Sequence, residues 1–149
     1  MRALKPFFHR YAIILPITVL IGLLIVSCES KDSQCKKIIQ VANQAVNDAK
    51  TITNSGRTSD PNTMLKAADA MDKAAKDMEG IKVQDEKLKK YQTGFISMYR
   101  STSTATREFV AAFQKKDKAG AQASLKNLQQ ATSPEKDLVN QINAYCAKK

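Results

Sequence analysis

The sequence predicts an all-α protein, an antiparallel up-down-up-down four-helix bundle that follows an apolar N-terminal segment. Three observations lead to this fold class. Glycine is scarce, with 5 in 149 residues, and no stretch alternates apolar and polar residues as a strand would. Apolar residues instead recur at steps of three and four over four later segments. Short connections separate these segments, so each helix is expected to run back along the previous one.

The N-terminal segment has the order of regions that is typical of a secretory signal peptide. Residues 1–10 contain three basic side chains and no acid, and the 17 residues from Tyr11 to Ser27 carry no charge. A membrane-spanning helix needs about 20 apolar residues, with a lower limit near 17. Pro16 and Gly22 further weaken this run as a permanent helix. A cleaved signal is therefore favoured over an uncleaved single-pass anchor.

The end of this run, Ile25, Val26, Ser27 and Cys28, resembles the bacterial lipobox. In that family a small residue precedes a cysteine that is lipidated, and a peptidase cuts just before it. The resemblance implies that residues 1–27 are a lipoprotein signal peptide. It also implies that acyl chains such as palmitate on Cys28 hold the protein on a membrane, facing the periplasm, a lumen or the extracellular side. The alternative is an uncleaved anchor whose cysteine stays unmodified.

Residues 28–33 are expected to form a polar tether, and residues 34–149 the helical domain. The first helix is predicted from about Ser33 to Thr53. Asp60 followed by Pro61 is a typical helix start, so a second helix is predicted over 61–79, closed by Gly80. The apolar positions of these two helices are Cys35, Ile38, Ala42, Ala45, Ala49, Ile52, Met64, Ala68, Met71, Ala75 and Met78.

The third helix is predicted from an Asp85 cap to about Gln114. Asp117 is expected to cap the last helix, whose apolar stripe stays in phase across Pro134. This pattern indicates either one long helix bent at Ser133–Pro134 or two short coaxial helices. The expected core positions are Leu88, Tyr91, Phe95, Met98, Thr102, Ala105, Phe109, Ala112 or Phe113, Leu125, Leu128, Thr132, Glu135, Leu138 or Val139, Ile142, and Tyr145 or Cys146.

The two remaining cysteines predict a disulfide. Cys35 opens the first helix and Cys146 closes the last, and both fall on an apolar stripe. In the predicted bundle these helix ends lie at the same end, and an exported domain meets oxidising conditions. We therefore expect a Cys35–Cys146 bond, with two buried free thiols as the alternative. A redox-catalytic role is not expected, because no Cys-x-x-Cys motif is present.

Composition excludes several classes of function. Removing residues 1–27 leaves 122 residues with 21 basic and 14 acidic side chains, a net charge of +7. The only histidine, His9, leaves with the signal, so imidazole catalysis and histidine metal ligands are absent. No calcium loop, phosphate-binding loop or nucleophile elbow occurs. We expect a non-enzyme without metal or cofactor, and no nucleic-acid binding, because aromatic residues do not interleave with the lysines.

Positive charge is somewhat richer at the end of the predicted bundle opposite the two cysteines. This distribution favours an acidic protein partner over simple adhesion to lipid. The residues of this candidate basic face are Arg57, Lys66, Lys115, Lys116 and Lys118.

Three features of the predicted core allow two interpretations each. The aromatic stripe that begins with Tyr91, Phe95 and Tyr99 is either bundle core, which is favoured, or a groove for a ligand or partner helix. Thr102 marks either a polar pocket or a hydroxyl that bonds back to the carbonyl four residues earlier, which is favoured. Glu135 either meets Arg100 or Arg107 inside the bundle or simply suits a helix start.

The C-terminal half, from "LKKYQTGFISMYRSTSTATREFVAAF" to "LVNQINAYC", resembles lipoproteins of cyanobacteria that have no assigned activity. The plan of lipid anchor plus four-helix bundle is also similar to lumenal accessory lipoproteins of photosystem II. These resemblances imply a membrane-tethered, non-enzymatic protein-binding or assembly factor. The alternative is a carrier that holds a small apolar ligand between its helices, and an enzyme ranks third.

Overall fold

A computed structural model describes residues 29–148, and this part of the chain is helical without strands. The predicted all-α class is therefore confirmed. The predicted signal peptide, residues 1–27, and the predicted lipid attachment site, Cys28, lie outside the described residues. The helices within 29–148 are α1 (Lys31–Ile52), α2 (Pro61–Glu79), α3 (Glu86–Gln114), α4 (Lys118–Thr132) and α5 (Glu135–Cys146).

Side-chain caps explain where the first four helices begin. Asp60, Asp85 and Asp117 each accept hydrogen bonds from backbone N–H groups in the first turn of α2, α3 and α4, as the sequence predicts. Ser30 does the same for α1 by accepting from the Ser33 N–H. Because of this cap, α1 begins at Lys31, two residues before its expected start, and residues 31–33 of the expected tether are helical.

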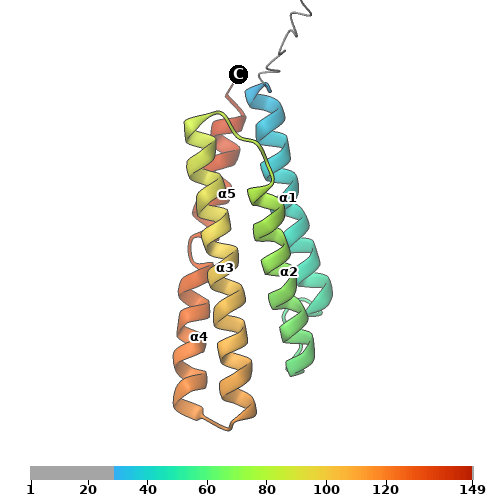
Figure 1. Ribbon diagram of the computed structural model, residues 1–149, viewed down its shortest axis with the longest axis vertical. Coiled ribbons are helices and arrows are strands. Elements are labelled where there is room, and N and C mark those ends of the chain that lie inside the picture. The colour runs from blue at the N-terminus through green and yellow to red at the C-terminus, as the bar shows by residue number, and fades with distance from the viewer. Residues whose placement is uncertain (1–28, 149) are drawn as a thin grey trace, which may run out of the picture.

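The helices lie side by side along one long axis (Figure 1). The longest, α3, packs against α2 on one side and against α4 and α5 on another, while α1 packs against α2. The last apolar stripe forms two helices that follow one another along α3. They are separated at Ser133 and Pro134, because proline has no N–H to continue the helical hydrogen bonds.

Figure 1 shows which segments lie at each end of the molecule. The C-terminus, the start of α1, the α2–α3 connection and the end of α5 lie at one end, which we call the disulfide end. The α1–α2 loop and the α3–α4 turn lie at the opposite end, which we call the far end. The five largest fully buried side chains come from α1, α2, α3 and α5: Phe95, Ile38, Met78, Leu88 and Ile142.

The far end is packed less completely than the sequence predicts. In α4 only Ser124 is buried. Leu125, an expected core position, is 45% exposed, so that prediction is wrong; of the Ala112 and Phe113 pair, Ala112 is buried and Phe113 is 55% exposed. The physical reason is that α4 packs chiefly against α3. Its apolar stripe is therefore wider than the surface that covers it.

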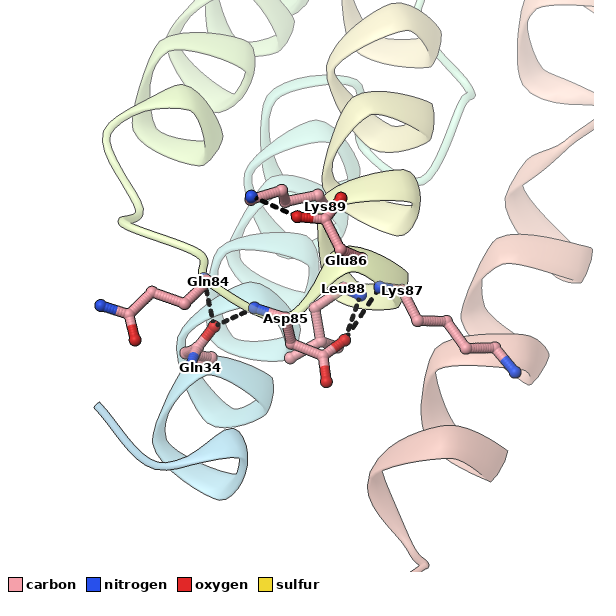
Figure 2. A network of polar contacts seen from close by, with 7 residues as sticks. All are labelled: Gln34, Gln84, Asp85, Glu86, Lys87, Leu88 and Lys89. Carbon is pink, nitrogen blue, oxygen red and sulfur yellow. Dashed lines mark hydrogen bonds and ion pairs between the residues drawn. The ribbon is translucent and has the colours of Figure 1, made fainter. Parts of the chain in front are cut away.

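At the disulfide end, Gln34 of α1 joins two segments of the chain (Figure 2). Its side-chain Oε1 accepts the backbone N–H of Gln84 at 2.7 Å and that of Asp85 at 3.2 Å. Its Nε2 donates to the Glu29 carbonyl at 2.7 Å. Gln34 is only 3% exposed, and a buried side chain of this kind needs such partners. It fixes the α2–α3 connection onto α1.

The predicted disulfide is present at this end. Cys35 and Cys146 are bonded, with their Cα atoms 5.9 Å apart and a sequence separation of 111. Beside it, the Tyr145 hydroxyl donates to Asp85 Oδ2 at 2.8 Å. The Lys31 ammonium lies 4.4 Å from the centre of the Tyr145 ring, a distance typical of a cation–π contact. The first and last helices are thus joined to each other and to the start of α3.

Candidate functional site

The five residues of the candidate basic face are all exposed and lie at or near the far end. Arg57 belongs to the α1–α2 loop, and Lys66 to the first half of α2. Lys115 and Lys116 form the turn after α3, and Lys118 opens α4. The fold therefore places the cations of two connections, which are far apart in sequence, at one end of the molecule.

These cations differ from the arginines in the middle of α3. Arg100 pairs with Glu79 of α2 at 2.6 Å. Arg107 pairs with Asp69 at 2.6 Å and Asp72 at 2.8 Å. By contrast, no ion pair within residues 29–148 involves any of the five cations of the basic face. Their charge is available to a partner, whereas the charge of the mid-helix arginines is used between α2 and α3.

The acids nearest to the basic face are occupied as helix caps. Asp60 Oδ2 accepts from both the backbone N–H and the hydroxyl of Thr63, at 2.8 and 2.6 Å. These hydrogen bonds hold the pKa of Asp60 below its ordinary value. Asp117 accepts the Gly120 N–H at 2.9 Å. Both carboxylates serve the local backbone and keep their negative charge, but the five cations of the basic face outnumber them and give the far end a net positive field.

An apolar cleft of about 230 Å³ opens between the α1–α2 loop, α2, α3 and α4; we call it the far-end cleft. The rings of Phe109 and Phe113 stack beside it with their centres 6.2 Å apart. Leu125 adds a further exposed apolar side chain. The remaining lining residues are Thr58, Ser59, Pro61, Met64, Val110 and Leu128. An exposed apolar patch with a charged rim is the usual composition of an interaction surface.

The loop that borders this cleft is built from residues that accept a left-handed backbone. Asn54, Ser55 and Gly56 have positive φ values of 48°, 58° and 80°. The Thr53 hydroxyl accepts the Gly56 N–H at 3.0 Å. Asn and Gly tolerate this conformation better than most residues do, so the turn can return the chain from α1 to α2 and present Arg57 beside the cleft.

The favoured core interpretation of the aromatic stripe is confirmed for its first part only. Tyr91, Phe95 and Tyr99 are buried, with Phe95 and Tyr99 stacked at 6.0 Å between ring centres, as expected for bundle core. Farther along the same helix, Phe109 and Phe113 line the far-end cleft. A single helical stripe is thus core at one end and surface at the other.

The two polar residues at core positions also have defined surroundings. The Thr102 hydroxyl donates to the Met98 carbonyl at 2.8 Å, so the favoured back-bonding interpretation is confirmed. Glu135 does not pair with Arg100 or Arg107, since both arginines bind acids of α2. It lies half-buried at the start of α5 and lines a second cleft together with Thr102 and Tyr99. Two features of the sequence pointed to this cleft. Glu135 and Thr102 are polar residues at positions where the helical pattern predicts buried apolar ones.

Sequence reasoning missed Gln34, the most buried polar contact of the disulfide end. Its signal is weak, because one glutamine in the first turn of a helix normally faces solvent. The informative detail is its phase: Gln34 precedes Ile38 by four residues and therefore lies on the buried side of α1.

Neither metal-binding clusters nor membrane-spanning helices occur in the described part of the chain. No group of three or more His, Cys, Asp or Glu side chains within residues 29–148 is placed to hold a metal ion. None of the helices in this range is both long and apolar enough to cross a membrane. Comparison with family models, curated proteins and solved structures finds no match to the chain.

Proposed function

We propose that this protein is an exported lipoprotein that is tethered by acyl chains on Cys28 and binds an acidic protein partner through its far end. It acts without catalysis, as a docking or assembly factor. Its domain is an antiparallel four-helix bundle in which α4 and α5 together form the fourth helix. The observation that carries the proposal is the asymmetry of the molecule: unpaired cations and exposed apolar side chains gather at the end opposite the disulfide.

Chain length supports the orientation of this bundle on a membrane. Helix α1 begins at Lys31, three residues after Cys28, and three extended residues span at most about 11 Å. The disulfide end is thus held close to the lipid, and the far end is directed away from it. Two or more acyl chains give durable anchoring, because a single chain binds a membrane only reversibly. A partner therefore meets the far end first.

The chemistry of the far end supports an acidic partner with an apolar anchor. Arg57, Lys115 and Lys116 attract acidic side chains and speed encounter. An apolar side chain of the partner then enters the cleft beside Phe113 and Leu125, where burial of apolar surface supplies affinity. Salt weakens the attraction between the cations and acidic side chains, but it has much less effect on the burial of apolar surface. Binding is therefore expected to weaken, without vanishing, as ionic strength rises.

Affinity capture of the full chain from membranes of its native host tests this proposal. The unmodified protein is compared with a far-end variant, K115E/K116E/K118E, and with a control variant, K82E/K90E/K136E. The control changes the same charge at exposed lysines away from the far end, none of which forms an ion pair within residues 29–148. An acidic partner should be recovered with the unmodified and control proteins and be reduced at least about tenfold with the far-end variant.

Mass spectrometry of the N-terminus in the same samples tests the anchor. The expected mature chain begins at an acylated Cys28. A chain that retains Met1 and carries an unmodified thiol at residue 28 would contradict the tether. Equal partner recovery by all three proteins would contradict the docking surface, independently of the lipid.

A further inference from the structure

A second apolar cleft, which we call the central cleft, lies halfway along the molecule and is distinct from the far-end cleft. It has a volume of about 270 Å³ and opens between α1, the buried side of α2 and α3, and the junction of α4 with α5. Ala45 and Ala49 of α1 form one wall, and Met71 and Met98 form the floor. Small alanine side chains leave this space unfilled where α1 faces the helix junction.

Tyr99 and Glu135 are the polar residues that concern us on this mostly apolar lining, which also includes Lys50, Thr102 and Thr132. Tyr99 is only 3% exposed, yet it lines the cleft. Glu135 also lines the cleft, at the start of α5 after Pro134, and its side chain is half-buried. Pockets that bind small molecules have this composition, mostly apolar with a few polar groups that fix orientation.

The Tyr99 hydroxyl opens onto the cleft and is not sealed in the core, because Ser103 Oγ is the only fully buried side-chain atom within residues 29–148 that lacks a hydrogen-bond partner. The Tyr145 hydroxyl, by comparison, donates to Asp85 at 2.8 Å. Within residues 29–148 no hydrogen bond satisfies the Tyr99 hydroxyl, and both its burial and the charge of Glu135 raise the pKa of Tyr99. The group therefore stays protonated at neutral pH and remains able to donate.

We propose that the central cleft binds a small, neutral, apolar molecule that carries a hydroxyl group, such as an aromatic or alicyclic alcohol. The ligand hydroxyl accepts from Tyr99 and donates to the Glu135 carboxylate, which satisfies both groups. Its apolar body contacts Met71, Met98 and the alanine wall. A volume of about 270 Å³ is near the lower end of ligand pockets and fits one or two rings. This site requires neither the lipid on Cys28 nor the far-end surface.

The test uses two probes of nearly equal size, 2-naphthol and 2-methoxynaphthalene, with the full chain in detergent at neutral pH. Only the first can donate a hydrogen bond. Calorimetric titration should give a dissociation constant at least about tenfold lower for 2-naphthol, because a hydrogen bond to a charged group is stronger than one between neutral groups. The two probes partition differently into detergent, so the free concentration of each is measured in protein-free detergent and used to calculate its dissociation constant.

Three variants locate the binding site. E135Q keeps the size of the side chain and should weaken 2-naphthol binding about tenfold while leaving 2-methoxynaphthalene unaffected. A49L fills the cleft and should abolish binding of both probes, and A144L, at an exposed alanine of α5 outside the cleft, should change neither. Circular dichroism establishes that each variant is folded. If A49L is not folded, binding of the two probes to E135Q alone tests the proposal. Absence of 2-naphthol binding to the unmodified protein, equal affinities for the two probes, or unchanged binding in E135Q would overturn the proposal.

Discussion

The two ends of this molecule use similar sequence patterns for different purposes. At the disulfide end, apolar residues of α1, α2, α3 and α5 meet around Leu88 and Ile142, which are 0% and 2% exposed. At the far end, the same helical periodicity continues in α3 and α4, yet Phe113 and Leu125 are exposed. Buried apolar packing is thus concentrated at the end that holds the disulfide. The opposite end keeps apolar surface and unpaired charge available for contact.

The largest test of this contrast removes the covalent link at the disulfide end. Replacing both Cys35 and Cys146 by serine frees a loop of 111 residues in the unfolded chain. In the chain-entropy model the free energy of unfolding falls by about 4 kcal/mol. Thermal unfolding with and without reductant measures the loss. A reductant should lower the unfolding midpoint of the unmodified protein and leave that of the double variant unchanged. If the double variant unfolds at the same temperature as the oxidised unmodified protein, the disulfide does not stabilise this end.

A matched pair of leucines tests packing at the two ends. Leu88 is fully buried at the disulfide end, and Leu125 is 45% exposed at the far end. Changing Leu88 to alanine should lower the free energy of unfolding by about 3 kcal/mol, because a cavity remains in the core. The same change at Leu125 should cost less than about 1 kcal/mol. Urea unfolding measures both values, and similar costs would show that the far end is packed as tightly as the other.

Gln34 tests the polar contribution at the disulfide end. Q34A leaves the backbone N–H groups of Gln84 and Asp85 without their acceptor, and a buried unsatisfied group costs about 1–3 kcal/mol. The control is Q44A, also on α1, whose exposed side chain bonds only Asp48. Its cost should be within about 0.5 kcal/mol. If hydrogen exchange at the α2–α3 connection is unchanged in Q34A, Gln34 does not fix that connection.

Lowering the pH should reduce the stability of the disulfide end, because Asp85 becomes protonated. This is the smallest of the four effects predicted for the two ends. Hydrogen bonds from the Leu88 N–H and the Tyr145 hydroxyl hold the pKa of Asp85 below its ordinary value. Its stabilising contribution is therefore complete above the unfolded-state pKa of about 3.9 and is lost as pH falls through the lower folded-state value. D85N should lose less stability than the unmodified protein over this range. Urea midpoints measured as pH is lowered check the difference, and parallel curves would contradict it.

Local sequence signals predicted the helices well because each depends on neighbouring residues. Asp60 and Pro61 mark the start of α2, and Pro134 marks the break between α4 and α5. The pairing of Cys35 with Cys146 followed from helix order and apolar phase together. For α1 the Ser30 cap was overlooked, so its start was placed two residues late.

The far end was harder to predict because periodicity identifies an apolar face without showing what covers it. Leu125 lies on such a face, but α4 packs chiefly against α3 and leaves it exposed. For Glu135 the sequence allowed either a contact with Arg100 or Arg107 or a role at a helix start. Those arginines bind Glu79, Asp69 and Asp72 across the α2–α3 contact. Which side chains pair across two helices depends on how the helices are placed relative to one another. The apolar stripe of a single helix does not determine that placement. The two clefts became visible only with that placement.

The bond between the first and last helices has a consequence for proteolysis. Any single cut between Cys35 and Cys146, including one in the exposed α1–α2 loop, leaves two fragments that remain covalently joined. A protease that nicks this loop therefore does not release the remainder of the domain from whatever holds residue 28. The damaged protein would migrate as one band on a non-reducing gel and as two after reduction.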